Sequence, residues 1–309
     1  MSAEQRIVLA ICTRNRPRML GECLTSVLQL DVPEGTVLDI LVVDNSEDSA
    51  MRQRNREALA GLPGGEAVTV RHEPRMGIPF ARNCAIDRAL EIEADALVLL
   101  DDDQTVPRDW LTVMDRVARE ESADIVKTGV TFVLEGKARY AEQFEDRRRR
   151  APDSLRTRGV HFLSTNGVWI SARIFGPLAT RFDEKEAFSG GDDTMFFLEA
   201  FERGAMMVET LEVWAFETVP VEKQTLRWLL RRSFNGGVGR ASQRQNNKIP
   251  IYYLFSGLSQ ALLYGFIALF LIWNPPAFVY RLRRAAQAVG LMRGAFGHRT
   301  EVYRQVVGQ

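Results

Sequence analysis

Short apolar runs alternate with amphipathic stretches along the N-terminal third of the chain. Ile7 to Cys12 and Leu38 to Val43 are mostly apolar, which is the pattern of buried parallel strands. Between them, the segment from Pro17 to Leu30 repeats apolar residues every three or four positions and has proline in its first turn. The chain is therefore predicted to begin as strand, helix, strand.

A third and a fourth strand follow, again separated by a helix. We expect strands at Val68 to Arg71 and at Ala96 to Leu100, with a helix from about Ala81 to Glu91 after a loop rich in glycine and proline. Strands that alternate with helices in this way predict an α/β fold. Its sheet is expected to be right-handed and mostly parallel, with helices on both faces.

Beyond Trp110 the pattern becomes mixed. Ile125 to Val133 and Gly167 to Ser171 have the composition of strands, and a helix is expected from about Asp193 to Arg203. No internal repeat or low-complexity linker interrupts these residues. We therefore expect one domain over residues 1–245, with a parallel first half and a mixed α+β second half.

The segment from Ile249 to Tyr280 contains no Asp, Glu, Lys or Arg. Its first 25 residues, if helical, would extend ~37 Å, which exceeds the ~30 Å core of a bilayer. Trp273 lies near one end and basic residues flank both ends, so membrane contact is favoured over a buried core helix. Because Pro275-Pro276 can turn the chain back, spanning, re-entrant and in-plane arrangements all stay open for residues 246–309.

The formal net charge of zero hides an uneven distribution. From Lys223 onward the chain has thirteen lysine or arginine residues and one acid, a net charge of +12, so the first 222 residues carry −12. An even overall balance argues against nucleic acid as the main partner. A basic tail around an apolar stretch suits an anionic lipid surface.

The cysteines and the N-terminus bear on the compartment. Cys12, Cys23 and Cys84 form no CxxC pair and the three histidines are far apart, so a zinc cluster is not expected and the compartment is expected to be reducing. The residues after Met1 lack the long apolar region of a secretory signal. The N-terminal part is therefore expected to stay in the cytosol.

Polar side chains follow three of the expected strands at the point where each strand ends. Thr13 and Asn15 come after the first, Asp44 after the second and Asp101-Asp102-Asp103 after the fourth. Ligands of an open α/β sheet bind beyond the carboxyl ends of its strands, so these side chains are expected to meet at one edge. Asp44 and Asp101 suit hydrogen bonds from a base or a ribose hydroxyl. Carboxylates separated by one residue suit Mg²⁺ or Mn²⁺ on phosphates, with Asp103 as the metal ligand.

An acidic triplet also occurs as a simple turn or helix cap. Its neighbours in the sequence therefore decide between this structural role and metal binding. Arg82 lies after the loop at Gly77, near an expected helix start, and its guanidinium can pair with a diphosphate in a bidentate manner. A surface ion pair is the alternative role for Arg82. Together with the triplet, Arg82 favours a phosphate-binding edge.

Five short motifs follow one another along the chain. They are Cys12-Thr13-Arg14-Asn15-Arg16-Pro17, Val42-Val43-Asp44-Asn45-Ser46, Gly77 with Ala81-Arg82-Asn83, Leu100-Asp101-Asp102-Asp103, and Ser189-Gly190-Gly191-Asp192-Asp193. In this order they resemble the motifs of the inverting family-2 glycosyltransferases with the GT-A fold, and the resemblance covers residues 7 to about 240. The resemblance implies a Rossmann-like nucleotide-binding half and an α+β acceptor half.

The resemblance also implies roles for individual residues. Thr13, Asn15 and Asp44 would bind the nucleotide of the donor, and Arg82 would contact the nucleotide or its phosphates. Asp101, Asp102 and Asp103 would form the DxD element, which binds ribose and a divalent metal, Mn²⁺ or Mg²⁺.

The general base would come from the last of the five motifs. Asp193 would take this role, but Asp192 stands where the family more often has glutamate, so either aspartate can be the base.

Two departures from the family pattern bear on metal and acceptor. Many relatives carry His-Glu after the last strand, whereas this chain has Phe216-Glu217, so metal affinity is expected to be low.

Residues 224–228 match the QxxRW pattern of processive synthases, and Gln224, Arg227 and Trp228 would border the acceptor site. An amphipathic stripe explains the same segment without catalysis. No membrane helix precedes the catalytic domain, so single-sugar transfer is favoured.

Within the family the chain is most similar to bacterial enzymes of exopolysaccharide assembly, notably the succinoglycan-type glucosyltransferases. The similarity implies transfer of one sugar from a nucleotide-diphosphate sugar, with UDP as the default, to a lipid-linked or polysaccharide acceptor. The location implied is the cytoplasmic face of the bacterial inner membrane. The alternatives are a nucleotidyltransferase or phosphoryl-transfer enzyme on a related fold, and a non-catalytic membrane scaffold.

Overall fold

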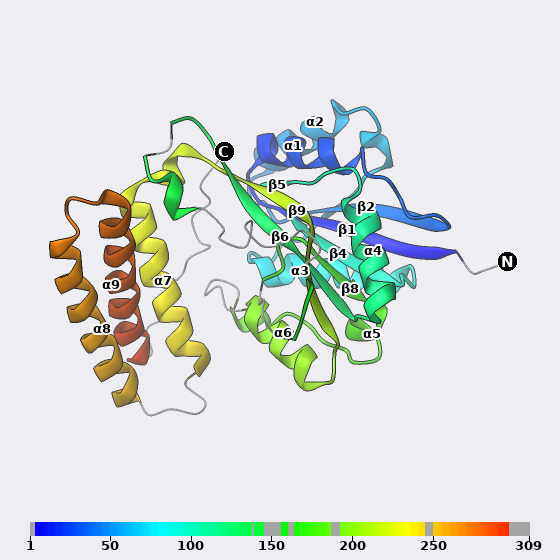
Figure 1. The fold of residues 1–309 in the computed structure, drawn as a ribbon. Helices are drawn as coiled ribbons and strands as arrows, with labels where there is room; N and C mark the ends of the chain where they lie inside the picture. The colour runs from blue at the N-terminus through cyan, green and yellow to red at the C-terminus, as the bar shows by residue number, and fades with distance from the viewer. Residues whose placement is uncertain are drawn as a thin grey trace.

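The structure is a computed structural model that describes residues 4–137, 139–144, 156–159, 164–186, 192–244 and 250–296. These residues form an α/β domain and, beside it, a layer of three helices (Figure 1). Ser189, Gly190 and Gly191 of the last motif lie outside the described residues.

The described residues form one sheet of nine strands, in the order β3-β2-β1-β4-β8-β6-β9-β5 with β7 paired to β9. Strands β3, β2, β1 and β4 are all parallel, as expected, whereas β8 runs antiparallel to both β4 and β6. The bounds are β1 (Gln5–Thr13), β2 (Thr36–Asp44), β3 (Thr69–His72), β4 (Ala96–Asp101), β5 (Gln104–Thr105), β6 (Ile125–Leu134), β7 (Arg156–Arg158), β8 (Val168–Ser171) and β9 (Met207–Val219).

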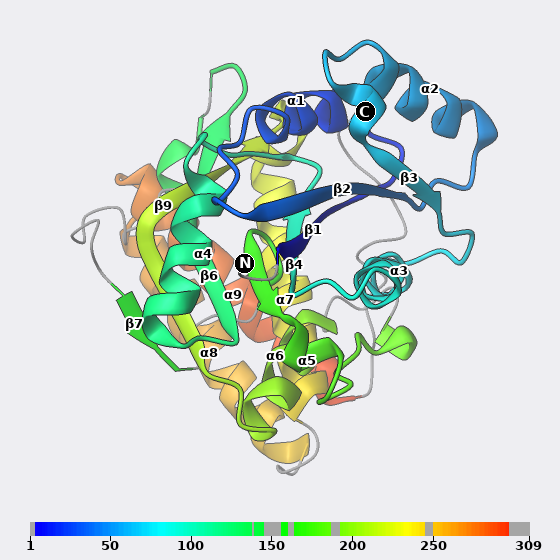
Figure 2. The same ribbon diagram turned by 90° about the vertical axis from the view of Figure 1, so that its right-hand side faces the viewer.

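Helices cover both faces of the sheet, because alternate side chains of each strand point to opposite sides. Leu9 of β1 belongs to the core beneath α1, α2 and α4, and its neighbour Ala10 belongs to the core beneath α3, α5 and α6 (Figure 2). The helices are α1 (Pro17–Val27), α2 (Ser49–Ala60), α3 (Ile78–Glu91), α4 (Trp110–Glu121), α5 (Ala172–Phe175) and α6 (Asp192–Glu202). The short 3-10 helices are η1 (Gly65–Ala67), η2 (Ala141–Gln143), η4 (Glu184–Glu186) and η5 (Val221–Gln224).

The first helix is shorter than its apolar pattern predicted. It starts at Pro17, whose fixed φ suits a first helical turn, but ends at Val27. Gln29 and Leu30 donate their backbone N–H groups to carbonyls three residues back, at 3.2 and 3.1 Å. This tighter turn closes the helix before Leu30.

The uncharged stretch near the C-terminus forms a hairpin of two helices instead of one long helix. The helices of the layer are α7 (Leu226–Arg244), α8 (Pro250–Phe270) and α9 (Pro275–Ala295). The chain reverses between α8 and α9, and Pro275-Pro276 occupies the first turn of α9. Helix α9 packs against both α7 and α8 and lies between them (Figure 1). Within the described residues, only Ile251–Phe270 is long and apolar enough to cross a membrane, and 17% of this span is buried.

Glycines bring the backbones of α7 and α9 into direct contact. A Cβ atom built on Gly290 would lie 2.0 Å from the carbonyl oxygen of Phe234, and one on Gly237 would lie 2.0 Å from that of Gln287. A Cβ on Gly294 would lie 2.7 Å from the Cβ of Ala241. Small residues four positions apart allow helices to approach this closely. The layer is therefore expected to behave as one rigid unit.

We expect Gly290→Ala to destabilise the protein, because no side chain fits between α9 and the backbone of α7. Overpacking of this kind costs about 1–3 kcal/mol, which should appear as a lower midpoint of thermal unfolding. The matched control is Gly265→Ala on α8, where no atom lies within 4 Å of the added Cβ. The control should be neutral or stabilise by up to about 1 kcal/mol. Equal unfolding midpoints for the two variants would contradict the close contact.

Candidate active site

The acidic triplet lies at the carboxyl edge of the sheet, where β4 ends and a turn leads into β5. Asp101 is the last residue of β4, and its backbone N–H donates to Gln104 Oε1 at 3.2 Å. The carbonyl oxygen of Asp103 accepts from the N–H of Thr218 on β9 at 2.7 Å. The turn is therefore held from two sides.

Asp102 and Asp103 bind cationic side chains from two distant parts of the chain. Asp102 accepts hydrogen bonds from Thr13 Oγ1 and from Arg16 Nη1, both at 2.8 Å. Asp103 Oδ2 lies 3.2 Å from Arg16 Nη1 and 3.4 Å from Lys223 Nζ. Burial raises the pKa of Asp102, and the Arg16 guanidinium acts in the opposite direction. Thr13, predicted as a nucleotide ligand, is thus joined to the acidic turn.

Arg82 forms ion pairs with both aspartates at the start of α6. Its Nη1 lies 2.6 Å from Asp192 Oδ2 and also contacts Asp193 Oδ1. Its Nη2 lies 3.8 Å from Asp101 Oδ1, so one guanidinium joins the acidic turn to the N-terminus of α6. Arg82 therefore lies between the two groups of carboxylates.

The two aspartates of α6 differ in accessibility. The side chain of Asp192 is 3% exposed and that of Asp193 is 24% exposed. Burial raises the pKa of Asp192 to about 7, against the opposing effect of the Arg82 charge. Asp193 Oδ2 accepts hydrogen bonds from the backbone N–H and the Oγ1 of Thr165, both at 3.2 Å. Asp193 is thus oriented and open to an incoming hydroxyl, whereas Asp192 is buried behind it.

The residues after β2 shape the neighbouring part of the edge. Asp44 accepts hydrogen bonds from the backbone N–H of Ser46 at 2.9 Å and from Asn55 Nδ2 at 3.0 Å. Asn15 has a left-handed φ of 56° and donates its backbone N–H to Ser46 Oγ at 2.9 Å. The loops after β1 and β2 therefore support each other. Asp44 already has two donors there, so its contact with a nucleotide stays a prediction.

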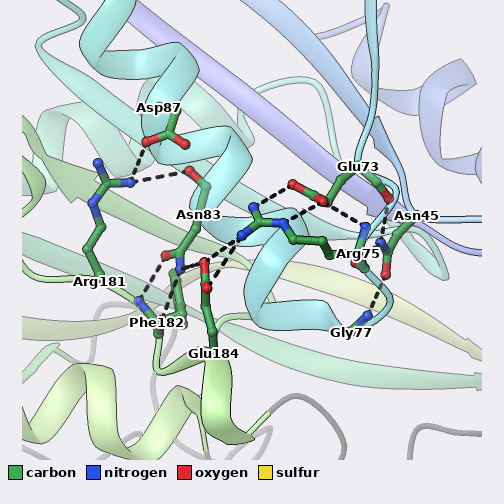
Figure 3. A network of polar contacts seen from close by, with 9 residues as sticks. All are labelled: Asn45, Glu73, Arg75, Gly77, Asn83, Asp87, Arg181, Phe182 and Glu184. Atoms are coloured by element: carbon green, nitrogen blue, oxygen red, sulfur yellow. Dashed lines mark hydrogen bonds and ion pairs between the residues drawn. The ribbon is translucent and has the colours of Figure 1, made fainter.

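Asn45 organises the loop that leads to α3 (Figure 3). Its Nδ2 donates to the carbonyl oxygens of Glu73 and Arg75, each at 2.8 Å, and its Oδ1 accepts from the N–H of Gly77 at 2.9 Å. Gly77 has a φ of 136°, which favours glycine. The loop therefore starts α3 at a fixed place, one turn before Arg82.

Polar contacts also hold α3 to the segment that precedes α6 (Figure 3). The Asn83 side chain donates to the carbonyl of Phe182 and accepts from its N–H, both at 3.0 Å. The Arg82 guanidinium lies over the Phe182 ring, 5.4 Å from its centroid. Asn83 and Phe182 thereby fix the orientation of Arg82.

Glu217 on β9 joins the acidic edge. Burial and the nearby charge of Asp103 raise its pKa to about 7, while Arg232 and Lys223 act to lower it. Burial likewise raises the pKa of Asp101 to about 7. The pKa values of both carboxylates are thus raised mainly by burial, with a further contribution from the neighbouring carboxylates.

The acidic edge can be tested for its fit to a divalent ion. Among the described residues, no three acidic, histidine or cysteine side chains are grouped as a ready-made metal site. Asp103 and Glu217 do offer carboxylate oxygens, which are the ligands that Mg²⁺ and Mn²⁺ prefer. Mg²⁺ commonly takes one or two carboxylates together with phosphate and water oxygens. The donor set therefore fits a divalent ion that also binds a diphosphate.

Three buried polar atoms near the triplet have no hydrogen-bond partner among the described residues. They are Asn15 Oδ1, Arg16 Nε and Gln104 Nε2. Buried donors and acceptors are normally paired, so these atoms are available to a polar ligand at the carboxyl edge.

The residues predicted for the acceptor lie where β9 meets α7. Gln224 is buried, and its Nε2 donates to the carbonyls of Glu135 and Val219 at 2.9 and 2.8 Å. Trp228 stacks on Phe144 with ring centroids 6.3 Å apart, and Arg227 is exposed. Gln224 thus ties the ends of β6 and β9 together, and the acceptor role of all three residues stays a prediction.

Sequence reasoning found one half of this edge and missed the other. The predicted Thr13, Arg82, Asp101, Asp102, Asp103, Asp192 and Asp193 lie together. Lys223 and Thr165 were missed, because only the folded chain brings them to the triplet and to Asp193. Arg16 belongs to the first motif, but no role was predicted for it, because nothing in the sequence next to it indicates an ion pair with Asp102.

Comparison with known proteins agrees with this geometry. The model of the family described as Glycosyl transferase family 2 matches residues 8–177. The succinoglycan biosynthesis protein ExoM of Rhizobium meliloti (strain 1021) is 31% identical over 245 residues, which cover 75% of this chain and 72% of that protein.

Solved structures of low sequence identity share the fold. The mannosyltransferase PcManGT from Pyrobaculum calidifontis, in complex with GDP-Man and Mn2+, superposes with a TM-score of 0.64 at 16% identity, covering 96% of this chain and 88% of that chain. S. aureus TarS in complex with UDP-GlcNAc gives a TM-score of 0.56 at 12% identity, covering 94% of this chain and 91% of that chain. These likenesses confirm the predicted GT-A fold.

Proposed function

This chain belongs to glycosyltransferase family 2, and we propose that it transfers one sugar, with inversion, from a nucleotide-diphosphate sugar to a lipid-linked saccharide in exopolysaccharide assembly. One observation carries the assignment of the site. The accessible carboxylate of Asp193 shares the Arg82 guanidinium with Asp101 of the acidic turn. A proton acceptor and a diphosphate-binding edge thus lie on either side of one cation.

Asp193 acts as the general base of the proposed reaction. Its carboxylate takes the proton of the acceptor hydroxyl while that oxygen attacks the anomeric carbon. The bond from this carbon to the diphosphate oxygen breaks on the opposite side, and the nucleoside diphosphate leaves with the electron pair. The hydrogen bonds from Thr165 support this role, because they hold the carboxylate in one orientation.

Arg82 neutralises the leaving diphosphate. A guanidinium that is held at the edge in the free protein can stabilise the charge that develops on the leaving group. Arg82 leaves Asp193 for the diphosphate when the donor binds, so the donor also frees the base. The ion pairs of Arg82 with Asp192 and Asp101 support this, since they keep the guanidinium at the edge.

A divalent ion, Mn²⁺ or Mg²⁺, would be held by Asp103 together with Glu217 and the diphosphate. When bound, it would neutralise charge on the leaving group. Lys223 and Arg16 contact Asp103, so they would yield to the ion or turn toward the phosphates. The nucleotide lies beside this edge, near Thr13, Asn15 and Asp44.

The membrane surface is the proposed location of the acceptor. The exposed apolar side chains of α8 and the basic charge after Lys223 support a lipid-linked acceptor at the cytoplasmic face of the inner membrane. The phosphoryl-transfer alternative gains no support, because β1 ends at Thr13 instead of an aspartate nucleophile.

The proposed function is tested by donor screening. Purified protein, Mn²⁺ and one nucleotide sugar at a time are added to lipid extracts of a strain that lacks the protein. The masses of the lipid-linked intermediates are then measured by mass spectrometry. We expect one intermediate to gain the mass of one sugar with one donor only. Release of nucleoside diphosphate without any sugar-bearing lipid, or repeated addition of sugars, would contradict the proposal.

A further inference from the structure

Helix α8 presents a continuous apolar face that nothing in the described structure covers. Its large apolar side chains recur every three or four residues and are between 46% and 70% exposed, and they are Ile251, Phe255, Leu258, Leu262, Phe266 and Leu269. The opposite face packs on α9, where Tyr253 and Ala268 are buried. Both faces of α8 are apolar, and one of them is exposed. An exposed apolar face of this size indicates contact with another apolar surface.

Helix α8 cannot cross a bilayer without its two neighbours. The α7 and α9 helices run alongside it in one layer, and Gly290 and Gly237 bring their backbones into contact (Figure 1). Helices α7 and α9 together contain nine arginines. An arginine at the centre of a bilayer is strongly disfavoured. If the three helices spanned the bilayer, several of these arginines would lie in the hydrocarbon core. The charge of the arginines therefore argues against a spanning arrangement.

The catalytic domain is attached to the opposite side of the layer. Leu229 of α7 and Val279 of α9 are buried with Val219 of β9, and Gln143 Nε2 donates to the carbonyl of Pro276 at 3.0 Å. Helix α8 is the member of the layer farthest from the sheet (Figure 1). Its apolar face therefore points away from the domain and is accessible to a flat surface.

Cationic groups line the flank of α8. The guanidinium groups of Arg281 and Arg284 lie 5.7 and 5.2 Å from the ring centroid of Tyr264, and Arg284 Nη2 donates to its hydroxyl at 3.2 Å. Trp273, in the turn after α8, is 93% exposed. Arginine and tryptophan at the border of an apolar face are typical of helices that lie at the lipid headgroups.

A groove between α8 and α9 has the same chemistry on a smaller scale. It has a volume of about 530 Å³ and is lined by Leu254, Val289, Met292, Arg293 and Phe296. Its walls are almost wholly apolar. A groove of this kind suits the acyl chain of a phospholipid.

We propose that α8 lies in the plane of an anionic phospholipid leaflet, with its open face below the headgroups and with α9 and α7 above it. The protein is then attached to one leaflet and crosses none. This inference rests on the proposed function only for the location of the acceptor. Attachment of α8 to the leaflet requires neither the sugar donor nor the acceptor. Apolar burial supplies the attachment, and the arginines of α9 select anionic headgroups.

Depth-dependent fluorescence quenching separates an in-plane from a spanning helix. In full-length protein carrying Trp273→Phe, a tryptophan is introduced by Phe255→Trp, Leu262→Trp or Leu269→Trp, and each protein is bound to phosphatidylglycerol vesicles with bromine at defined acyl positions. The signal of the Trp273→Phe protein itself, which keeps four tryptophans, is subtracted. The in-plane arrangement gives the same shallow depth at all three positions. A deep Leu262→Trp between two shallower positions would show a spanning helix and overturn the proposal.

Vesicle sedimentation tests the face itself. Leu262→Glu combined with Phe266→Glu should lower binding to phosphatidylglycerol vesicles at least roughly tenfold, because two large apolar side chains no longer contribute their burial to the attachment. Gln260→Glu adds one negative charge, as the single variant Leu262→Glu does, but on the side of α8 turned toward α9, and it should bind as the wild type does. Wild-type binding by the double variant, or equal binding to phosphatidylcholine vesicles, would overturn the proposal. Both assays succeed or fail independently of sugar transfer.

Discussion

The Asp193→Asn variant is expected to transfer sugar about a hundredfold to ten-thousandfold more slowly than the wild type, because the loss of a general base removes that much of the rate. Asparagine keeps the shape of the side chain and its hydrogen bonds from Thr165 but cannot accept the proton. Donor affinity should change by only a few-fold, since Asp101 and Asp192 still orient Arg82. The measurement is the initial rate at saturating donor, with donor binding followed separately by calorimetry.

Asp192→Asn is the matched control for this prediction. Asp192 is buried and its pKa is raised to about 7, so a neutral side chain there resembles a form that the native protein already populates. The control should retain its rate to within about tenfold, as expected for a residue that positions Arg82 without touching the acceptor. An inactive Asp192→Asn protein beside an active Asp193→Asn protein would reverse the assignment of the base.

Removal of the divalent ion is expected to have the second-largest effect. Several kcal/mol of charge stabilisation on a leaving diphosphate corresponds to about a hundredfold to a thousandfold in rate. Treatment with a chelator should therefore abolish most of the transfer, and added Mn²⁺ should restore it. Asp103→Asn should lose the same activity without restoration at ordinary Mn²⁺ concentrations, because one carboxylate ligand is missing.

Two further variants make the metal experiment specific. Asp109→Asn removes an exposed carboxylate six residues after the triplet in the sequence, and it should keep its Mn²⁺ response. Lys223→Gln removes a cation that lies 3.4 Å from Asp103, so Mn²⁺ should bind this variant more tightly than the wild type. Full turnover by chelator-treated protein shown to be free of metal would contradict the assignment of Asp103.

The parallel half of the sheet could be read from the sequence because its information is local. Continuous apolar runs such as Leu38 to Val43 identify strands buried on both faces, and the residues after them identify the carboxyl edge. The confirmed fold shows that this reasoning is sound for β1 to β4. The end of α1 was less accurate, because a tightened last turn leaves no clear trace in the apolar pattern.

The second half of the site depends on contacts between distant parts of the chain. Lys223 and Asp103 are separated by 120 residues, and only the pairing of β5 with β9 brings them together. The Phe216-Glu217 pair was noted as a departure from the family, but the proximity of Glu217 to Asp103 required the structure. Gln224 shows the converse, since a residue that matches a motif serves here as a tie between strand ends.

The sequence limited the arrangement of the C-terminal helices to a few alternatives but did not distinguish between them. The uncharged run from Ile249 to Tyr280 includes α8, the turn and the start of α9, so hydropathy alone does not separate them. Gly290 and Gly294 have the spacing of a close helix contact, but the spacing does not say which helix they meet. Their contact with α7 is what joins the basic helices to the apolar one.

The central claim is that this acidic edge transfers a sugar with inversion at the anomeric carbon. The most direct test is nuclear magnetic resonance of the product formed from an α-linked nucleotide sugar and the acceptor found by donor screening. We predict a β-linked sugar in the product, and none from the Asp193→Asn protein within the same time. An α-linked product, or equal product from the variant, would contradict the account.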